Sequence, residues 1–434
     1  MMRGRGRLLL PVLLLPVLLG GCVLFDAHQQ ITQMESVCVI AGTVRSAGEA
    51  TGGPYVVAVV REAGPEGELP MPVDHVLTGA RGEWFFALAP GRYSVLAFRD
   101  NDADLSYRAG EPVHHVDGGA PIGCAAGERH APIEIVIREG DRPLHPLTLS
   151  PSRDLPALGG AALPAASLGQ LTTFGEVTDL DDPRFAREVA RDSLWRPLDF
   201  LQAGHAGVYF LEPFDPQREP VLLIHGINGT PRVFDTLIEA LDRDRFQPWV
   251  YYTASGVPLQ ASAIHLAQVM EELEVRHAVR SLRVVAHSMG GLVARAFLQE
   301  REDRGATAQV TQLITLATPW QGSEGARHGV QTSPLVLPVW RDMATGSDFL
   351  EGLFAPEAGP VAAEFHLVFS YQRDEGRAHT ASDGTVTLSS MLPVRAQARA
   401  TSVFGVEASH TGILRHPDSL AWVASLLTDA AAGD

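Results

Sequence analysis

Ser288 is the residue whose surroundings point most directly to chemistry. Residues 286–291 read Ala-His-Ser-Met-Gly-Gly, after a predicted strand and at the start of a predicted helix. A tight strand-to-helix turn holds a serine hydroxyl above a sheet, and it needs small neighbours because its backbone is crowded. Such a serine attacks a carbonyl carbon once a base removes its proton. Ala286 stands where the usual Gly-x-Ser-x-Gly pattern has a glycine, and a serine at an ordinary helix cap is the alternative.

Two residues further along the chain can complete this nucleophile. His410 lies between the last predicted strand and the last predicted helix, and Asp383 follows an earlier strand. A histidine here would take the serine proton and give it to the leaving alcohol, while the acid would fix the histidine tautomer. Asp374 is the alternative acid, and His416 is the alternative base.

Residues 225–230, His-Gly-Ile-Asn-Gly-Thr, form a loop directly after the first strong predicted strand. Acyl transfer needs preorganised N–H donors that stabilise the oxyanion of its intermediate. The backbone N–H of Met289, the residue after the nucleophile, is one such donor, and the loop lies where a second is needed.

The elements that position these residues alternate between strand and helix. Strands are predicted at residues 208–211, 221–225, 246–252, 282–286, 310–316, 365–371 and 402–406, with amphipathic helices between several of them. This alternation predicts an α/β fold with a mostly parallel sheet covered on both faces.

Taken together, residues 195–431 resemble α/β-hydrolases of the lipase and esterase kind. The resemblance is carried by residues 286–291 and 225–230, by the Asp-Gly-x-Val segment at residues 383–386, and by Thr-Pro-x-x-Gly at residues 318–322. It implies the α/β-hydrolase fold and cleavage of carboxylic esters through an acyl-enzyme on Ser288, with acyl lipids as the expected substrates, as for a lipase, an esterase or a phospholipase. It also implies Ile227 N–H as the second oxyanion donor and a structural role for His225. No cofactor and no catalytic metal are implied.

Several alternatives stay open for this region. The same residues would serve acyl transfer to another alcohol or amide cleavage, and a fold of this kind can also be used for binding alone. Residues 320–364 are apolar and exceed an ordinary connection, so they could form a lid over an acyl-binding cleft or extra packed core.

The N-terminus has the pattern of a secretory signal. Arg3, Arg5 and Arg7 precede a short apolar run over residues 8–19, which is shorter than a membrane span. The run ends in Leu-Gly-Gly-Cys at residues 19–22, which resembles the lipobox of bacterial lipoproteins. This resemblance implies removal of residues 1–21, lipid on Cys22, a tether over residues 22–37 and a place in the cell envelope. With Val23 after the cysteine, it implies the outer membrane of a Gram-negative bacterium.

Residues 38–138 alternate short β runs with turn residues and predict a small all-β sandwich domain. The segments at residues 42–44, 82–86 and 90–95 resemble carboxypeptidase-regulatory or transthyretin-like domains. Such domains usually support or anchor a protein and seldom carry out chemistry. Cys38 and Cys124 remain once Cys22 is lipidated, so a disulfide between them is expected in an oxidising compartment, with two free thiols as the alternative.

A loop in this domain has acids at the spacing of a calcium-binding loop: Asp100, Asp102, Asp104 and Glu111. Leu105 occupies the position of the usual glycine, and no helix pattern flanks the loop. The alternatives are therefore a structural Ca²⁺ site and a plain polar loop. Proline-rich residues 139–194 are predicted to be a linker or arm before the catalytic domain at residues 195–434.

Composition excludes several classes of protein. The chain has 434 residues, 45% of them hydrophobic, which excludes wholesale disorder. Its 34 basic and 51 acidic residues give a formal charge of −17, which argues against nucleic acid as a partner, because phosphate backbones need basic surfaces. The expected partners are an ester substrate and the membrane; the oligomeric state is left open.

Overall fold

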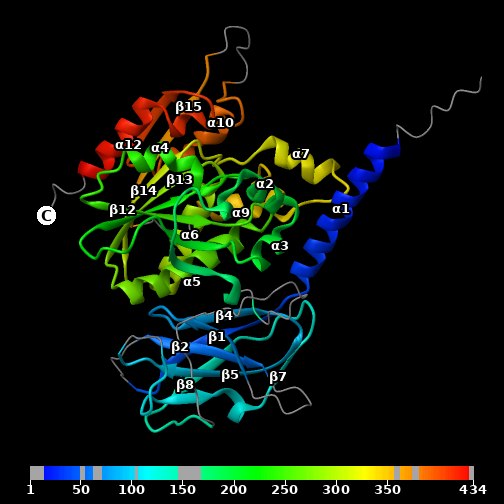
Figure 1. Cartoon of the computed structure of the whole chain (residues 1–434), viewed down its shortest axis with the longest axis vertical. Helices are drawn as coiled ribbons and strands as arrows, with labels where there is room; N and C mark the ends of the chain where they lie inside the picture. Colours follow the sequence, from blue (N-terminus) through cyan, green and yellow to red (C-terminus); the bar gives the residue numbers. More distant parts are fainter. Residues whose placement is uncertain are drawn as a thin grey trace, which may run out of the picture.

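The computed structural model describes residues 14–48, 54–61, 71–102, 106–144, 167, 169–355, 362–373 and 381–429. Their strands form three sheets, of three, five and eight strands. The two smaller sheets lie together at the bottom of Figure 1, and the large sheet with its helices lies above them. We refer to residues 38–137 as the N-terminal unit and to residues 169–429 as the C-terminal unit.

The N-terminal unit consists of two sheets with a shared core. One has the order β4-β1-β8, and the other has the order β3-β2-β5-β6, with β7 also paired to β5. Trp84 and Phe86 of one sheet belong to the same buried cluster as Val57 and Val95 of the other. The strands are β1 (Cys38–Ser46), β2 (Tyr55–Arg61), β3 (Met71–Leu77), β4 (Glu83–Leu88), β5 (Gly91–Arg99), β6 (Val113–His115), β7 (Ile122–Cys124) and β8 (Ile133–Ile137).

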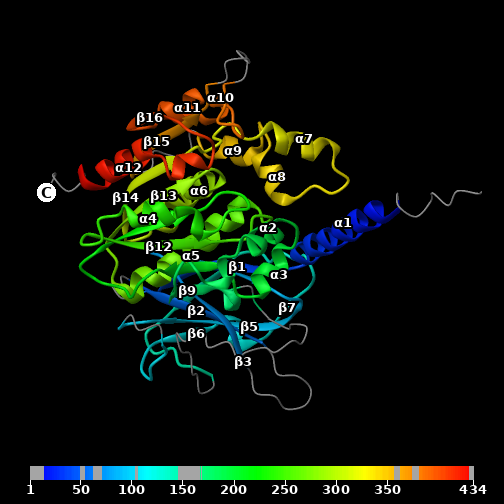
Figure 2. The same cartoon turned by 45° about the horizontal axis from the view of Figure 1, so that its top comes forward.

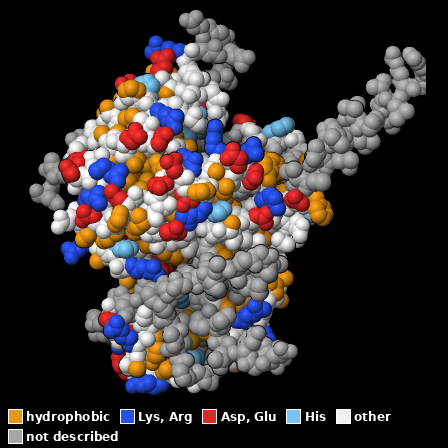
Figure 3. Space-filling view, viewed as in Figure 1, with side chains coloured by type: hydrophobic (Ala, Val, Ile, Leu, Met, Phe, Trp, Pro, Cys, Tyr) orange, Lys and Arg blue, Asp and Glu red, His pale blue; other side chains and the backbone are white. Residues whose placement is uncertain are grey.

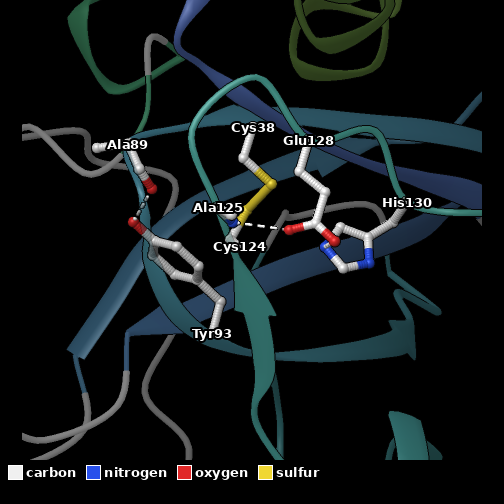
Figure 4. Close-up of a disulfide and its surroundings, with 7 residues drawn as sticks. All are labelled: Cys38, Ala89, Tyr93, Cys124, Ala125, Glu128 and His130. Carbon is white, nitrogen blue, oxygen red and sulfur yellow. Dashed lines mark hydrogen bonds and ion pairs between the residues drawn. A yellow bond between two sulfur atoms is a disulfide. The ribbon is translucent and has the colours of Figure 1, made fainter.

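A disulfide joins Cys38 at the start of β1 to Cys124 at the end of β7, with a Cα–Cα distance of 5.7 Å (Figure 4). It therefore ties one sheet to the other. Nearby, the Tyr93 hydroxyl donates to the Ala89 carbonyl at 2.7 Å. Both sulfur atoms are buried in the shared core, which is where the bond constrains the unit most directly.

The C-terminal unit is built on an eight-stranded sheet with the order β16-β15-β14-β13-β11-β12-β10-β9. The six strands from β16 to β12 in this order are parallel, and β10 pairs antiparallel with β12. The strands are β9 (Thr173–Val177), β10 (Gly207–Phe210), β11 (Glu219–Ile224), β12 (Phe246–Tyr252), β13 (Ser281–His287), β14 (Gln309–Leu316), β15 (Glu364–Tyr371) and β16 (Ser402–Glu407).

Helices cover both faces of this sheet, as its side-chain pattern requires. Leu222 and Ile224 of β11 pack into one buried cluster, and Val221 and Leu223 pack into another. Successive side chains of a strand point to opposite faces, so a strand that is apolar throughout needs cover on both sides. The mostly parallel α/β sheet predicted from the sequence is therefore confirmed.

The longer helices of this unit are α2 (Arg187–Trp195), α5 (Leu259–His277), α6 (Met289–Arg304), α7 (Glu324–Thr332) and α12 (Pro417–Asp429). Shorter helices are α3 (Pro197–Gln202), α4 (Asp235–Glu239), α8 (Pro338–Met343), α9 (Asp348–Gly352), α10 (Leu388–Met391) and α11 (Val394–Gln397). Single 3₁₀ turns occur at η2 (Gly169–Leu171), η3 (Pro183–Phe185), η4 (Pro231–Phe234) and η6 (Gly412–Leu414), and η1 (Val116–Gly119) lies in the N-terminal unit.

The predicted linker over residues 139–194 is too long. Strand β9 lies inside it and forms the edge of the large sheet by pairing with β10, and α2 also falls within it. The reason is that β9 is half exposed and carries polar residues, so it has no buried apolar run to mark it. In the N-terminal unit, Pro72, Asp74 and His75 likewise interrupt the apolar pattern of β3.

Helix α1 (Leu14–Glu35) spans the end of the predicted signal, Cys22 and most of the predicted tether. Its C-terminal part is docked on the C-terminal unit: Ala27 and Ile31 are buried, and the Gln30 amide exchanges hydrogen bonds of 2.7 and 3.0 Å with Asp199 in α3. In both Figure 1 and Figure 2, α1 projects from the side of the molecule that carries α2, α3 and α7. No helix in the described residues is long and apolar enough to cross a membrane.

The two units contact each other through the end of α6. Arg304 is held by the Glu271 carboxylate of α5 at 2.7 Å and donates to the Glu83 carbonyl of β4 at 3.4 Å. In return, the Arg304 carbonyl accepts from the Arg81 N–H at 3.3 Å. The buried ion pair thus anchors the N-terminal unit against α5 and α6, away from the carboxyl ends of the strands.

Candidate active site

Ser288 lies at the turn between β13 and α6 in a strained conformation, with φ 54° and ψ −128°. This positive φ is unusual for a residue with a side chain, and it persists only where the surroundings enforce it. Here the turn leaves no room for larger neighbours. A Cβ added at Gly290 would lie 2.3 Å from the Ile224 carbonyl oxygen, and one at Gly291 would lie 2.0 Å from Thr318 Oγ1. The two glycines therefore allow α6 to start directly against β11 and hold the serine in place.

The three residues predicted as nucleophile, base and acid come together at the carboxyl ends of the parallel strands. His410 Nε2 lies 2.9 Å from Ser288 Oγ, and His410 Nδ1 lies 2.7 Å from Asp383 Oδ2. The serine follows β13, the acid follows β15 and the histidine follows β16, so three strands of one sheet supply one hydrogen-bonded chain. Such a chain is what a serine nucleophile requires for activation.

Asp383 is almost fully buried, and all its carboxylate contacts are satisfied. Oδ2 also accepts from the Ser370 hydroxyl at 2.7 Å, and Oδ1 accepts from the backbone N–H groups of Thr385 and Val386 at 2.9 and 2.7 Å. Burial raises the pKa of Asp383, but the hydrogen bonds from His410, Ser370 and Val386 outweigh it, so the pKa lies below its usual value. The acid is therefore ionised and faces His410 as a fixed acceptor.

The two amides predicted to form an oxyanion hole belong to Ile227 and Met289. Within the described part of the chain, neither N–H donates to another protein group. The loop that carries Ile227 is held by the Asn228 N–H, which donates to Ser255 Oγ at 2.8 Å, and by the Gly229 N–H, which donates to the Gly226 carbonyl at 3.0 Å. Rigid, unused donors beside a nucleophile are suited to a developing negative charge.

Two further histidines support the site without belonging to the hydrogen-bonded chain. His287 Nε2 donates to the His410 carbonyl at 2.9 Å, and its burial, together with the charge of His410, lowers its pKa to about 3. His225 Nδ1 donates to the Gly226 carbonyl at 2.8 Å, its Nε2 accepts from the Thr253 N–H at 3.3 Å, and burial lowers its pKa to about 4. Both rings stay neutral and hold the backbone of the base and of the oxyanion loop.

Ser288 and His410 open into a pocket of about 870 Å³. Part of its wall is apolar and comes from Ala326 of α7, from Trp340 and Met343 of α8, and from Ile227. These helices lie in the long segment 320–364 that was predicted as lid or extra core. Val339 and Met343 are buried in the main cluster, while Trp340 lines the pocket, so the segment serves as pocket wall and packed core together.

Other predicted site residues lie elsewhere. The ligand atoms of Asp100, Asp102 and Glu111 lie within 4.8 Å of one another, between β5 and β6 and without a flanking helix; Asp104 is outside the described residues. Glu111 accepts from the N–H groups of Asn101 and Arg108, at 2.9 and 2.8 Å. Glu111 is therefore partnered by the loop, Asp102 pairs with Arg108 at 2.8 Å, and calcium binding there stays a prediction.

The alternative acid Asp374 lies outside the described residues. The alternative base, His416, accepts from the Asp418 N–H at 3.3 Å and makes no contact with Ser288. Cys22 falls within α1, and its lipidation stays a prediction. Sequence reasoning missed Ser370, Ser255 and His287 as supports of the site. Only His287, which lies next to the nucleophile, had a signal in its position.

The sheet order, the turn at Ser288 and the succession of serine, acid and histidine along the chain define an α/β-hydrolase fold. A protein-family model described as PGAP1-like alpha/beta domain matches residues 257–345, which include the nucleophile turn. A comparison with curated protein sequences finds no match.

Solved structures of lipases are similar to part of this chain at low sequence identity. The mature lipase BlEst2 of Bacillus licheniformis is 18% identical, with a TM-score of 0.41, and the match covers 51% of this chain and 98% of that one. Lipase B of Aspergillus fumigatus is 15% identical with a TM-score of 0.39, covering 52% and 57%. Phospholipase PlaB of Legionella pneumophila is 16% identical with a TM-score of 0.33, covering 40% and 45%.

Proposed function

We propose that this protein is a serine hydrolase that cleaves carboxylic esters of acyl lipids through an acyl-enzyme on Ser288. The observation that carries the proposal is the continuous chain from Ser288 Oγ through His410 to Asp383, with bonds of 2.9 and 2.7 Å. It ends in a buried carboxylate whose remaining acceptor sites are filled.

In the proposed reaction Ser288 Oγ attacks the ester carbonyl carbon while His410 Nε2 takes its proton. The N–H groups of Ile227 and Met289 stabilise the oxyanion, and the imidazolium of His410 is stabilised by Asp383. His410 then protonates the leaving alcohol, which leaves an acyl group on Ser288. A water molecule that gives its proton to His410 hydrolyses this acyl-enzyme, and the serine is restored. No cofactor or metal takes part.

The pocket supports a substrate with an acyl chain. Its apolar wall of Ala326, Trp340 and Met343 offers a chain of carbon atoms a surface beside the nucleophile. Burial of methylene groups there is favourable by roughly 0.8 kcal/mol each. A longer acyl chain therefore binds more tightly until the wall ends.

The test is hydrolysis of p-nitrophenyl esters with acyl chains of two to sixteen carbons by the purified full chain in detergent, with Ser288→Ala as control. A fluorophosphonate probe, followed by peptide mass analysis, reports whether Ser288 is the reactive serine. Turnover and labelling that both vanish in the variant are expected, with faster cleavage of the longer chains. An unlabelled Ser288 with no ester turned over would exclude the hydrolase and favour a binding role.

We further propose that Cys22 carries lipid and that the protein is a cell envelope lipoprotein, facing the membrane through α1. The short apolar run and the Leu-Gly-Gly-Cys sequence at residues 19–22 support this. Growth with a labelled fatty acid should label the chain, and Cys22→Ser should abolish the label. Intact mass of the mature chain gives its first residue, and a mature chain that begins elsewhere than at Cys22 would refute the proposal.

A further inference from the structure

The charges that line the active-site pocket are all of one sign. Arg187, Arg232 and Arg415 line it, and no Asp or Glu of the described residues does so. This is unexpected in a chain with a formal charge of −17. On the face shown in Figure 3, acidic and basic side chains are mixed over the C-terminal unit, so the pocket differs from that surface.

Arg232 is held in place without being neutralised. Its Nη2 donates to the backbone carbonyls of Asp181 and Asp182, both at 2.9 Å, and its Nε is buried without a hydrogen-bond partner. Carbonyl groups orient a guanidinium but carry no net charge. Within the described residues no carboxylate pairs with Arg232, so its positive charge remains available to a ligand.

The other two arginines stand beside it. Arg187 is the first residue of α2, is exposed, and has no ion-pair partner within the described part of the chain. Arg415 pairs with Asp235 at 2.7 Å, but both side chains are largely exposed, at 60% and 42%. Exposed ion pairs of this kind contribute little free energy, so Arg415 can leave Asp235 for an anionic ligand at a small cost in free energy.

Two of the three arginines lie shortly after catalytic groups in the chain, whereas Arg187 comes from α2. Arg232 comes five residues after Ile227, and Arg415 comes five residues after His410. Ala326, Trp340 and Met343 of the apolar wall come from different elements, α7 and α8. One pocket therefore offers an acyl chain and an anion separate surfaces. Since Arg415 is on the loop of the base that protonates the leaving alcohol, the anion belongs to the alcohol portion of the ester.

We propose that Arg187, Arg232 and Arg415 form a cationic rim that selects esters whose alcohol portion carries a phosphate group, as in glycerophospholipids. The inference rests on the proposed function. A guanidinium matches the geometry of phosphate oxygens with two parallel N–H bonds and stays charged at all working pH values. A carboxylate offers related chemistry with a single charge, and the experiment separates the two.

The experiment uses the full chain and three esters with the same eight-carbon acyl chain, below their micelle concentrations. Their alcohols are glycerol, glycerol phosphate and glyceric acid. The expected kcat/KM for the phosphate ester exceeds that for the neutral ester by about ten- to a hundredfold, as hydrogen bonds to charged groups allow. The carboxylate ester should lie between them, and equal rates for the two anions would show that charge alone, and not phosphate, is selected.

In the double variant Arg187→Gln and Arg232→Gln, the ratio of phosphate to neutral ester should fall toward one. Arg232→Lys should retain part of the ratio, because it keeps the charge but not the planar fork. Arg327→Gln is the matched control, since Arg327 is an exposed arginine of α7 that does not line the pocket. Melting temperatures check that each variant is folded.

The outcomes separate this inference from the proposed function. If the neutral ester is cleaved and Ser288 is labelled, but all three esters give equal kcat/KM, the cationic rim is refuted and the hydrolase stands. If the variant lowers all three rates alike, the arginines maintain structure and do not select. If no ester is cleaved and Ser288 is unlabelled, the proposed function itself fails.

Discussion

The buried residues that hold Ser288 and His410, which we call the floor of the site, and the cationic rim of the pocket are built in opposite ways. On the floor, Asp383 and His287 are buried and their polar atoms are bonded to neighbours fixed by strand ends. On the rim, Arg187 and Arg415 are exposed and lie at a helix start and in a loop. If the proposed function and the cationic rim hold, chemistry and selectivity are carried by parts of different burial: hydrogen-bonded buried groups for the reaction, and exposed side chains for the choice of ester.

The largest effect is expected on the floor, from Asp383→Asn. The asparagine amide is a poorer acceptor for His410 Nδ1–H than the carboxylate. The imidazole then favours the tautomer with its proton on Nε2, which cannot take the serine proton, and kcat falls by about 10⁴. Ser370→Ala is the matched control. It removes only one hydrogen bond to the same carboxylate, and kcat should fall by no more than about tenfold. Equal losses in both variants would contradict a role for the charge of Asp383.

The next effect tests how closely the floor is packed. A Cβ at Gly226 would lie 2.8 Å from the Ser288 Cβ, so Gly226→Ala should displace the nucleophile or the oxyanion loop. We expect kcat to fall about a hundredfold, as for misplacement of a reacting group by about 1 Å. Gly352→Ala meets no atom within 4 Å and should leave kcat unchanged. An unaltered kcat in Gly226→Ala would show that the loop tolerates movement.

The third prediction concerns stability in acid. Burial lowers the pKa of His287 to about 3, whereas an unfolded histidine has a pKa near 6.5. Between these pH values the unfolded chain binds a proton that the folded chain does not. The free energy of unfolding therefore falls as the pH drops, by up to about 5 kcal/mol from this group.

Denaturant titrations between pH 7 and pH 4 measure this loss. His287→Gln keeps a donor for the His410 carbonyl and cannot titrate, so its stability should decline less steeply with acid. His328→Gln, at an exposed position of α7, should follow the unmodified chain. Parallel curves for all three proteins would mean that His287 does not supply the acid sensitivity.

The smallest effect belongs to the rim and comes from salt. Attraction between exposed arginines and an anionic ester is screened as ionic strength rises. From about 0.05 to 0.5 M salt, kcat/KM for the phosphate ester should fall roughly three- to tenfold, while that for the neutral ester stays level. A fall of equal size for both esters would point to a change in the protein rather than in the attraction.

The same contrast explains what the sequence could predict. Ser288, Asp383 and His410 each follow a strand, and their order along the chain gives their proximity, because parallel strands end at one edge of a sheet. Arg187 offers no such signal, since it precedes the nucleophile by about a hundred residues and lies in what looked like a linker. Strand β9 was missed for a related reason, because an edge strand that is half exposed has no apolar pattern.

The docking of α1 limits the distance between the active-site pocket and a lipid on Cys22, if that lipid is attached as proposed. The helix is buried against the C-terminal unit from Ala27 onward, and only about five residues separate this point from Cys22. Fully extended, they span at most about 17 Å. With lipid on Cys22 as proposed, the short segment between Cys22 and Ala27 keeps the pocket within a thin layer above one bilayer. The enzyme would then respond to the number of lipids per unit of membrane area, and not to their concentration in solution.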